Sequence, residues 1–443
     1  MATEDKADVI IVGAGPAGIA AAITLAKAGL TVVIFERGEY PGSKNVFGGI
    51  LFTTILEKLT PDFLKADPQP VERHVTKRGF SVLSKDSELY LSFQSEEFNK
   101  PPYNHSFTAL RAKFDKWFAQ QVEAAGALLV TSTVVDDVIE KGGKIVGVKT
   151  RRENGDMYAD VVIIAEGANS FIAEKRGWRK KFNAEHMIVG AKMVIGLPSE
   201  IIEDRFNLEK DEGLAIEYFG DAVLGMVGSG FIYTNKESLS VGMGVTIESI
   251  NKTSAAGKPI RPQDVLDYLT QHPCVKNLLR GGQVLEYSAH MIPEYPMEEM
   301  PKFVHNGCLL VGDAAGFINI NPIYQEGTNF AMASGLMAAE TILDAKKKGN
   351  FSEKTLSAFT QKLEKSFVMQ DVRKNRKLPA FGAKNPQFFT TYPDAVLEAA
   401  QRFFTVDDQP KRMAQKLALR TFFRKANSFR LVVDTIKAIR AMF

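Results

Sequence analysis

The residues of this chain whose types and spacing point most directly to chemistry are glycines near its start. The run Gly13-Ala14-Gly15-Pro16-Ala17-Gly18 has the spacing G-x-G-x-x-G. In such a run the first glycine permits a tight turn, the second lets a pyrophosphate approach the backbone, and the third allows a helix to pack closely on a strand. Glu36 follows eighteen residues after Gly18. A carboxylate there can accept both ribose hydroxyls of an adenosine, so the spacing predicts a dinucleotide site and disfavours a 2′-phosphate.

The elements that must position these residues follow from the hydrophobic pattern. Residues 8–12 predict a short buried strand, residues 19–28 an alanine-rich helix, and residues 31–35 a second strand. The glycine turn then lies between strand and helix, and the helix N-terminus faces the phosphates. The alternative is a structural βαβ unit whose turn binds nothing.

Two later strands are also expected to end in an acid and glycines. Residues 157–165 run into Glu166-Gly167-Ala168-Asn169-Ser170, and residues 307–311 run into Gly312-Asp313-Ala314-Ala315-Gly316. In a doubly wound sheet such ends line the cofactor crevice. Asp313 directly precedes an expected helix, where it could bond a ribitol hydroxyl while the helix N-terminus stabilises negative charge on a reduced flavin. An ordinary helix N-cap is the alternative for Asp313.

With these three glycine-containing strand ends in this order along the chain, the chain resembles FAD-dependent oxidoreductases of the geranylgeranyl reductase and p-hydroxybenzoate hydroxylase superfamily. Residues 42–49, 71–73, 110–117 and 286–293 are similar to electron-transfer flavoprotein:quinone oxidoreductases of FixC/EtfC type. The resemblance is strong over residues 7–345. It implies an α/β fold, with a glutathione-reductase-type Rossmann FAD-binding domain, an inserted antiparallel-sheet quinone domain (α+β), and a helical C-terminal region.

The glycine motifs and the resemblance together give a set of expected FAD contacts. Residues 317–327 are expected to border the flavin and a lipid-substrate cavity, with an ordinary loop as the alternative. The whole set is Gly13, Gly15, Pro16, Ala17, Gly18, Glu36, Arg37, Lys44, Asn45, Gly48, Gly49, Arg111, Val135, Ala165, Glu166, Gly167, Gly312, Asp313, Gly316, Phe317, Ile318 and Asn319.

No catalytic residue and no metal ligand is assigned. The six histidines have no metal-ligand spacing, which favours a structural role for each. His290 lies in a segment that resembles the family, and its role is left open. Cys308 is expected to be buried and inert. Flavin chemistry needs no protein nucleophile, because the cofactor carries the electrons.

The expected FAD-binding domain is discontinuous and comprises residues 1–75, 103–180 and 285–345. The quinone domain comprises residues 76–102 and 181–284, in which strands are expected over residues 192–197, 213–218, 223–233 and 239–246. A hairpin turn is expected at residues 141–144. Residues 346–443 form the helical region.

Composition limits the classes of protein and partner. The two cysteines exclude a disulfide scaffold and a four-thiolate iron–sulfur cluster held by this chain alone. The resemblance therefore implies a ferredoxin-like partner of FixX/EtfX type. The polar, acidic N-terminus and the lack of an apolar stretch of ~20 residues favour a cytoplasmic chain without a membrane span.

The charge is uneven along the chain. Net charge is +3, but residues 409–443 carry nine basic side chains against Asp434, so this tail is +8 and the rest is −5. Arg412, Lys416, Arg420 and Arg424 form one helix stripe, and Phe429, Val432, Val433, Ile436, Ile439 and Phe443 form an apolar face on a second helix. The tail could lie on lipid headgroups, or dock on its own domain or on a partner subunit.

The leading hypothesis is FAD-dependent electron transfer from an electron-transfer flavoprotein, with or without a ferredoxin-like relay, to a membrane quinone such as menaquinone or ubiquinone. The protein would be peripheral on the inner face of the cell membrane, within or outside an electron-bifurcating complex, with no nucleic-acid partner. One alternative is a prenyl reductase, although the Tyr-x-Trp-x-Phe-Pro segment common in those enzymes is absent. Another is a scaffold that docks flavoproteins. Gly316, where related monooxygenases carry histidine, disfavours oxygen activation.

Overall fold

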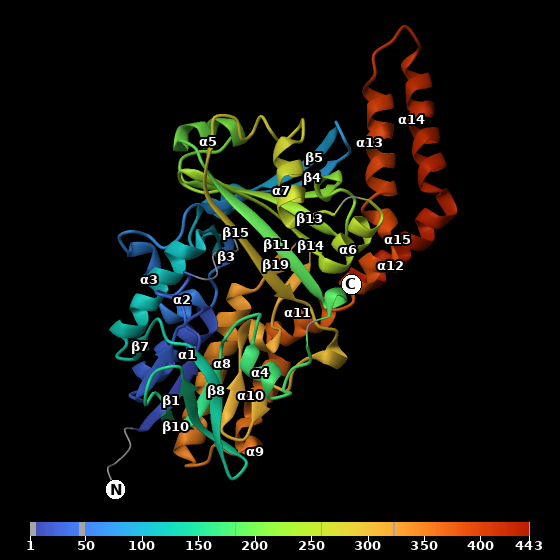
Figure 1. The fold of residues 1–443 in the computed structure, drawn as a ribbon. Helices are drawn as coiled ribbons and strands as arrows, with labels where there is room; N and C mark the ends of the chain where they lie inside the picture. The colour runs from blue at the N-terminus through green and yellow to red at the C-terminus, as the bar shows by residue number, and fades with distance from the viewer. Residues whose placement is uncertain (1–5, 44–48, 182, 258, 322–323, 443) are drawn as a thin grey trace.

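The computed structural model describes residues 6–43, 49–181, 183–257, 259–321 and 324–442. Two sheets stand one above the other, and helices of the C-terminal third run along both (Figure 1). Three of the expected FAD contacts, Lys44, Asn45 and Gly48, lie outside the described residues.

The first sheet has eight strands, and its central ones are parallel in the order β17-β10-β1-β2-β7. The hairpin β8–β9 joins it through β9, with the turn expected at residues 141–144. The strands are β16 (Val304–His305), β17 (Cys308–Leu310), β10 (Met157–Ile164), β1 (Lys6–Val12), β2 (Val32–Phe35), β7 (Leu128–Val130), β8 (Val135–Lys141) and β9 (Lys144–Thr150).

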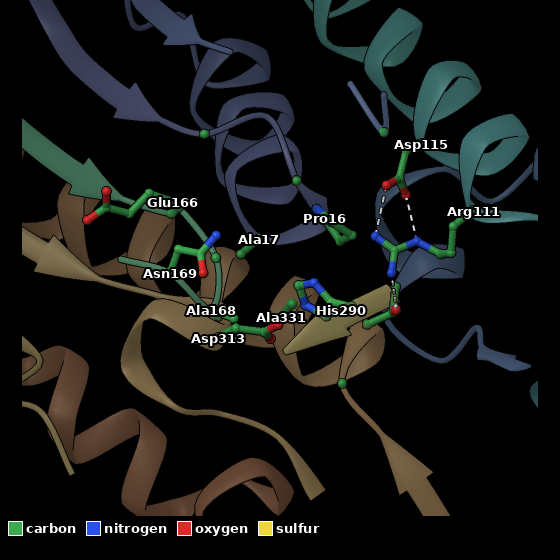
Figure 2. Close-up of a pocket in the computed structure, with 18 of the residues that line it drawn as sticks. Pro16, Ala17, Arg111, Asp115, Glu166, Ala168, Asn169, His290, Asp313 and Ala331 are labelled. Atoms are coloured by element: carbon green, nitrogen blue, oxygen red, sulfur yellow. Dashed lines mark hydrogen bonds and ion pairs between the residues drawn. The ribbon is translucent and has the colours of Figure 1, made fainter. Parts of the chain in front are cut away.

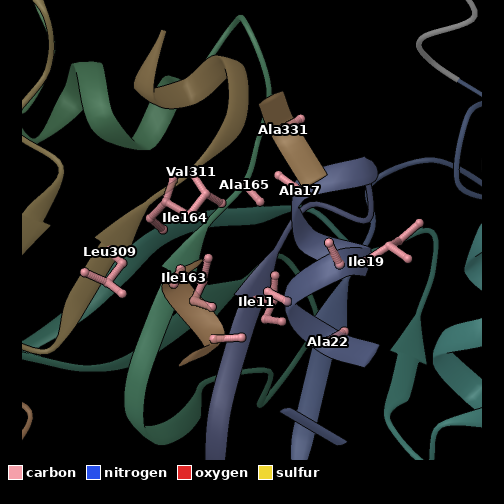
Figure 3. Packing of buried hydrophobic residues seen from close by; sticks show 14 of the residues in the cluster. Ile11, Ala17, Ile19, Ala22, Ile163, Ile164, Ala165, Leu309, Val311 and Ala331 are labelled. Atoms are coloured by element: carbon pink, nitrogen blue, oxygen red, sulfur yellow. The ribbon is translucent and has the colours of Figure 1, made fainter. Parts of the chain in front are cut away.

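Helices cover this sheet, and the carboxyl-terminal halves of its central parallel strands are apolar and buried, as parallel strands covered on both faces require. Ile11, Ile163 and Leu309 lie on adjacent strands and are fully buried (Figure 3). Helix α1 (Pro16–Lys27) packs against α8 (Thr328–Lys347) and α3 (Arg111–Ala124). At Gly335 of α8 a Cβ atom would lie 2.1 Å from the Ala17 carbonyl oxygen, so glycine permits this close helix contact.

The second sheet has nine strands in the order β15-β11-β14-β13-β12-β4-β6-β3, with β5 beside β4. Helices α5 (Ser199–Phe206), α6 (Ile247–Ala255) and α7 (Pro262–Gln271) pack beside it. Its strands are β3 (Ile50–Phe52), β4 (His74–Leu83), β5 (Glu88–Gln94), β6 (Ser106–Thr108), β11 (Met187–Gly196), β12 (Glu212–Gly220), β13 (Gly228–Thr234), β14 (Ser238–Thr246) and β15 (Gln283–Pro293).

This sheet differs from the sequence expectation in three respects. It is mixed, because β12 and β4 run parallel. β15, β3 and β6 belong to it, although their residues were expected in the FAD-binding part, since each finds its hydrogen-bonding partner in this sheet. The strand expected over residues 223–233 begins only at Gly228, because a 3-10 turn, Asp221–Val223, precedes it.

The C-terminal third is helical. A two-stranded hairpin, β18 (Asn319–Asn321) and β19 (Tyr324–Glu326), leads into α8. Its other helices are α9 (Glu353–Leu356), α10 (Ala358–Lys365), α11 (Phe367–Asn375), α12 (Leu378–Lys384), α13 (Thr391–Phe404), α14 (Lys411–Ala426) and α15 (Ser428–Met442). Two short helices, α2 (Leu56–Leu59) and α4 (Phe171–Lys175), lie earlier in the chain.

Helices α13 and α14 pair as a hairpin that projects beyond both sheets, and α15 returns toward α12 (Figure 1). Asp434 of α15 is buried and accepts hydrogen bonds from the Gln387 side-chain amide and the Tyr392 hydroxyl, each at 2.7 Å. Four residues of the expected apolar stripe of α15, Phe429, Val432, Ile436 and Ile439, are exposed, and Phe429 is 81% exposed. Phe443, also expected on this stripe, lies outside the described residues. No helix in the described ranges has the length and apolar character to span a bilayer.

Candidate functional site

A cavity of about 690 Å³ lies between the two sheets. The ends of β1, β2 and β10 bound one side, and strands β4, β12, β13 and β15 of the second sheet bound the other. Its volume falls within the range typical of cofactor pockets, roughly 300–1,000 Å³.

The glycine turn forms the floor of this cavity. Gly13 has φ +103°, and a Cβ atom there would lie 2.3 Å from the Ala165 carbonyl oxygen, so the turn requires glycine. A Cβ on Gly15 would instead meet no described atom within 4 Å, which leaves open space against the first turn of α1. Because amide groups at a helix N-terminus lack intrahelical acceptors, this space suits a phosphate.

Glu36 ends β2 at the edge of the cavity, as predicted. One carboxylate oxygen accepts a hydrogen bond from the Ala14 amide at 3.1 Å, and the other accepts from the Gly38 amide at 2.6 Å. These two bonds fix the carboxylate between the glycine turn and the β2 end. Lone pairs remain on both oxygens for ribose hydroxyls.

The loop after β10 forms a third wall of the cavity, and its acidic residue, Glu166, already accepts hydrogen bonds from within the loop and from α4. Glu166 accepts hydrogen bonds from the Ser170 hydroxyl and from the Ile172 amide at the start of α4, at 3.1 and 3.0 Å. Burial raises the pKa of Glu166, although these hydrogen bonds oppose the shift. Arg179 donates to the Ala168 and Asn169 carbonyl oxygens at 2.6 Å each and holds the loop.

Asp313 and Arg111 both line the cavity, and Figure 2 shows Arg111 paired with Asp115. Burial raises the pKa of Asp313 to about 6, opposed by the positive charge of Arg111. Arg111 donates two hydrogen bonds to Asp115, at 2.9 and 2.8 Å, and a third to the Thr328 hydroxyl at 3.3 Å. Asp313 lies within a 3-10 turn, Gly312–Ala315, and not directly before a helix as expected, because the β18–β19 hairpin intervenes before α8.

The second sheet contributes side chains that the motifs did not indicate. Arg78, Glu217, Phe231 and Tyr233 line the cavity from β4, β12 and β13, and Glu326 lines it from β19. The sequences of their strands show only the alternation typical of a sheet, and no motif distinguishes these residues. Asp115 was also missed as a site residue, although i,i+4 spacing from Arg111 is a readable ion-pair signal.

His290 of β15 also lines the cavity. Burial lowers the pKa of His290 to about 4, and the positive charges of Arg111 and Arg37 lower it further. The imidazole is therefore neutral at physiological pH.

Most of the expected FAD contacts converge on this cavity. Gly18, Gly316 and Phe317 do not line it: Gly18 packs against the Gly13 carbonyl, Phe317 is buried, and the Gly316 carbonyl accepts a hydrogen bond from Arg376. The residues that do line it are Gly13, Gly15, Pro16, Ala17, Glu36, Arg37, Gly49, Arg111, Val135, Ala165, Glu166, Gly167, Gly312, Asp313, Ile318 and Asn319.

These residues fit a flavin dinucleotide. The open space at Gly15 would take the pyrophosphate and the fixed Glu36 carboxylate the adenosine ribose. Asp313, at a different strand end in the same cavity, offers an acceptor for a ribitol hydroxyl.

Comparisons with known proteins agree with this geometry. Residues 8–168 match the family model "FAD dependent oxidoreductase", and residues 378–443 match "ETF-QO/FixC family C-terminal domain". The chain is 43% identical over 441 residues to Protein FixC of Azorhizobium caulinodans, with 99% of each chain covered. The chain belongs to the FixC/ETF-QO family. It is therefore an FAD-dependent oxidoreductase, as the glycine motifs and the resemblance predicted.

A second FixC-family relative has a more explicit name. The Escherichia coli K12 protein YdiS, called a "probable electron transfer flavoprotein-quinone oxidoreductase", is 38% identical over 442 residues, covering 99% of this chain and 100% of that protein.

Solved structures confirm the fold of this FixC-family chain. A geranylgeranyl bacteriochlorophyll reductase-like protein from Thermoplasma acidophilum superposes with a TM-score of 0.71 at 23% identity, covering 96% of this chain and 98% of that one. The flavin-dependent brominase Bmp2 gives 0.65 at 18% identity, covering 95% and 100%. One fold thus carries several flavin chemistries, and the site must decide among them.

Proposed function

We propose that this chain carries electrons through FAD from an electron-transfer flavoprotein to a quinone bound on the second-sheet side of the cavity. The observation that carries the proposal is the two-part lining of that cavity. A dinucleotide end lies at α1, and Phe231, Tyr233, Met291 and Ile292 line the side formed by the second sheet. An apolar, aromatic surface suits a quinone ring and its isoprenoid tail. The printed name of YdiS supports the same reaction.

FAD would supply the electron transfer, and the protein would supply binding, orientation and electrostatics. We propose that the α1 N-terminus holds the pyrophosphate, Glu36 the adenosine ribose and Asp313 the ribitol. The buried faces of Phe231 and Tyr233 would exclude water from the acceptor. The other expected FAD contacts, among them Lys44, Asn45 and Gly48, remain part of this proposal.

The electron source is the second part of the proposal. Two cysteines are too few for a four-thiolate cluster, and the thiol of Cys308 is buried. A ferredoxin-like subunit would therefore supply any iron–sulfur relay between the electron-transfer flavoprotein and this chain. In a bifurcating complex this chain would be the quinone-reducing subunit.

The C-terminal helices carry the proposed contact with the membrane. The tip of the α13–α14 hairpin exposes Phe404 and Val406, at 74% and 83%, and the Arg412, Lys416, Arg420 and Arg424 stripe of α14 is exposed beside it. Apolar side chains flanked by cations suit an anionic lipid surface. We propose that this hairpin and α15 hold the protein peripherally on the inner face of the cell membrane.

Co-sedimentation with vesicles tests the membrane part. Wild-type protein should sediment with phosphatidylglycerol vesicles, and Arg412→Glu combined with Lys416→Glu should stay in the supernatant. Binding of both proteins to vesicles of purely zwitterionic lipid, or equal binding of both to anionic vesicles, would contradict it.

Anaerobic quinone titration tests the reaction. The chain is purified with its co-purifying partners, its visible spectrum is recorded, and a short-chain quinone is added to the reduced protein. Rapid reoxidation of the flavin is expected. A bound flavin that ignores quinone but saturates geranylgeranyl chains would indicate a prenyl reductase, and a chain with no redox activity that only assembles flavoproteins would indicate a scaffold.

A further inference from the structure

Two buried polar side chains lie on the second-sheet side of the cavity. Ala215 pairs with Tyr233, and Glu217 pairs with Phe231, across strands β12 and β13, so these side chains share one face of the sheet. Glu217 is 2% exposed and Tyr233 is 4% exposed, and both line the cavity. The Tyr233 hydroxyl donates a hydrogen bond of 2.6 Å to Oε1 of Glu217.

The other carboxyl oxygen of Glu217 has no such bond. Oε2 is buried and has no hydrogen-bond partner among the described residues. Burial raises the pKa of Glu217 to about 8, with the Tyr233 hydrogen bond and the positive charge of Arg78 opposing the shift. The group is therefore neutral at pH 7. Because Oε1 already accepts the phenol proton, the acid proton belongs on Oε2.

A buried donor without an acceptor is costly, so its retention calls for a ligand that accepts its hydrogen bond. A carboxylic acid kept neutral in an apolar site is a known way to donate to a carbonyl oxygen. We propose that Glu217 donates a proton from Oε2 to a quinone oxygen during its reduction, and that Tyr233 positions the carboxyl group. This inference rests on the proposed quinone reduction.

A quinone takes up two electrons and two protons to become a hydroquinone. Two electrons and one proton come from the reduced flavin, and the other proton comes from Glu217. One O–H bond breaks at Oε2 and one forms on the quinone oxygen, which leaves a carboxylate that regains its proton from solvent.

Tyr233 is held rigidly enough to position its partner. Its ring stacks on Phe231 with centroids 4.6 Å apart and planes 13° from parallel. At Gly49, across the cavity wall, a Cβ atom would lie 2.5 Å from the same ring, so the ring fills that space. Burial raises the pKa of Tyr233 well above its usual value, and the phenol stays protonated.

Several other ionisable groups face this cavity and could shape its pH response. Arg78 of β4 lines the cavity, and its positive charge acts on Glu217. Lys192 of β11 does not line the cavity but is buried near Arg111, and burial lowers the pKa of Lys192 to about 8. Burial raises the pKa of Glu326 to about 7. The remaining ones are Glu36, Arg37, Arg111, Asp115, Asp136, Arg151, Glu166, His290 and Asp313.

Stopped-flow reoxidation of the reduced holoprotein by a short-chain quinone, from pH 6 to 9.5, tests the assignment. The wild-type rate should fall tenfold per pH unit above about pH 8, as neutral Glu217 is lost. Glu217→Gln should lower the rate at pH 6.5 by about 10²-fold or more and remove that pH dependence. Tyr233→Phe should move the apparent pKa upward, because the lost hydrogen bond had stabilised the carboxylate.

A second readout does not depend on turnover. Infrared titration of the protein should show a protonated-carboxyl band that disappears near pH 8 and is missing in Glu217→Gln. Burial also raises the pKa of Glu294 to about 8. The difference between the infrared spectra of the two proteins therefore assigns the band to Glu217 and not to Glu294. Glu212→Gln is the matched control: Glu212 is buried on the same strand, accepts from the Asn99 side chain at 2.7 Å and does not line the cavity.

Each outcome has one meaning. A Glu217→Gln protein with wild-type rate and pH profile, or no infrared difference, overturns the proton-donor assignment while quinone reduction by the wild type stands. A wild-type flavin that quinone does not reoxidise at any pH overturns the proposed function and this inference with it. Equal rate losses in Glu212→Gln and Glu217→Gln would show a structural effect and overturn the assignment.

Discussion

The end of the cavity at α1 offers a ligand mainly backbone, whereas the end beneath the second sheet offers buried ionisable side chains. Gly13, Gly15 and the first turn of α1 come from one continuous stretch. Glu217, His290 and Glu326 come from three separate segments, and burial shifts the pKa of each of them. Backbone amides do not titrate, so binding at the first end should be insensitive to pH, and the chemistry at the second should not be.

The largest expected effect is at the Arg111–Asp115 pair, both members of which line the cavity. Arg111→Met leaves Asp115, whose side chain is 3% exposed, without its bidentate partner. Loss of a partner from a buried ion pair costs about 3–5 kcal/mol. Urea denaturation should show this loss.

Two further variants sharpen that result. Arg111→Met combined with Asp115→Leu should recover most of the stability, because no buried charge is left uncompensated. Arg373→Met, which breaks the exposed Arg373–Glu364 pair, should change the unfolding free energy little. A double variant as unstable as the single one would contradict this account of the pair.

At the backbone end, Gly13→Ala should eliminate bound FAD and destabilise the fold by about 3 kcal/mol. The added Cβ would lie 2.3 Å from the Ala165 carbonyl oxygen, and φ at Gly13 is +103°. Flavin absorbance per protein and thermal melting measure the two effects. Gly29→Ala is the control, because φ is also positive there (+83°) but no described atom lies within 4 Å of the new Cβ. Comparable flavin loss in both variants would show that the turn is not the phosphate site.

The next expected effect is a pH dependence of the stability that arises at the end beneath the second sheet. In the unfolded chain Glu217 ionises near its ordinary pKa, and in the folded protein near 8. Between these values the folded state holds a proton that the unfolded state has lost, so stability falls as pH rises from about 5 to 8. The loss is at most about 1.4 kcal/mol per pH unit. Urea titrations of wild type and Glu217→Gln at each pH should differ by this slope, and parallel curves would contradict a buried neutral carboxyl.

The smallest expected effect is at Glu36. Glu36→Gln should weaken FAD binding about tenfold, since one charge-assisted hydrogen bond to a hydroxyl is lost (~1.4 kcal/mol). Fluorescence titration of apoprotein with FAD measures it, with Glu39→Gln, an exposed neighbour outside the cavity, as control. Equal affinities of Glu36→Gln and wild type would remove Glu36 from the proposed contacts.

The sequence by itself determined the dinucleotide end of the site. Gly13, Gly15 and Glu36 act within one βαβ unit, so their spacing along the chain is also their spacing in space, and strand β1, helix α1 and strand β2 formed where the hydrophobic pattern predicted. The same local logic identified the β8–β9 hairpin and the strand ends at Glu166 and Asp313.

Only the tertiary structure decided the other end. Tyr233, which is hydrogen-bonded to Glu217, lies against Gly49 because strands from remote parts of the chain form one sheet over the cavity. Strand alternation alone does not say which face of that sheet will be covered. Likewise β15 joined the second sheet, against expectation, because its hydrogen-bonding partner β11 lies nearly a hundred residues earlier in the chain. Burial, which sets the protonation of Glu217, His290 and Asp313, arises only when those segments assemble.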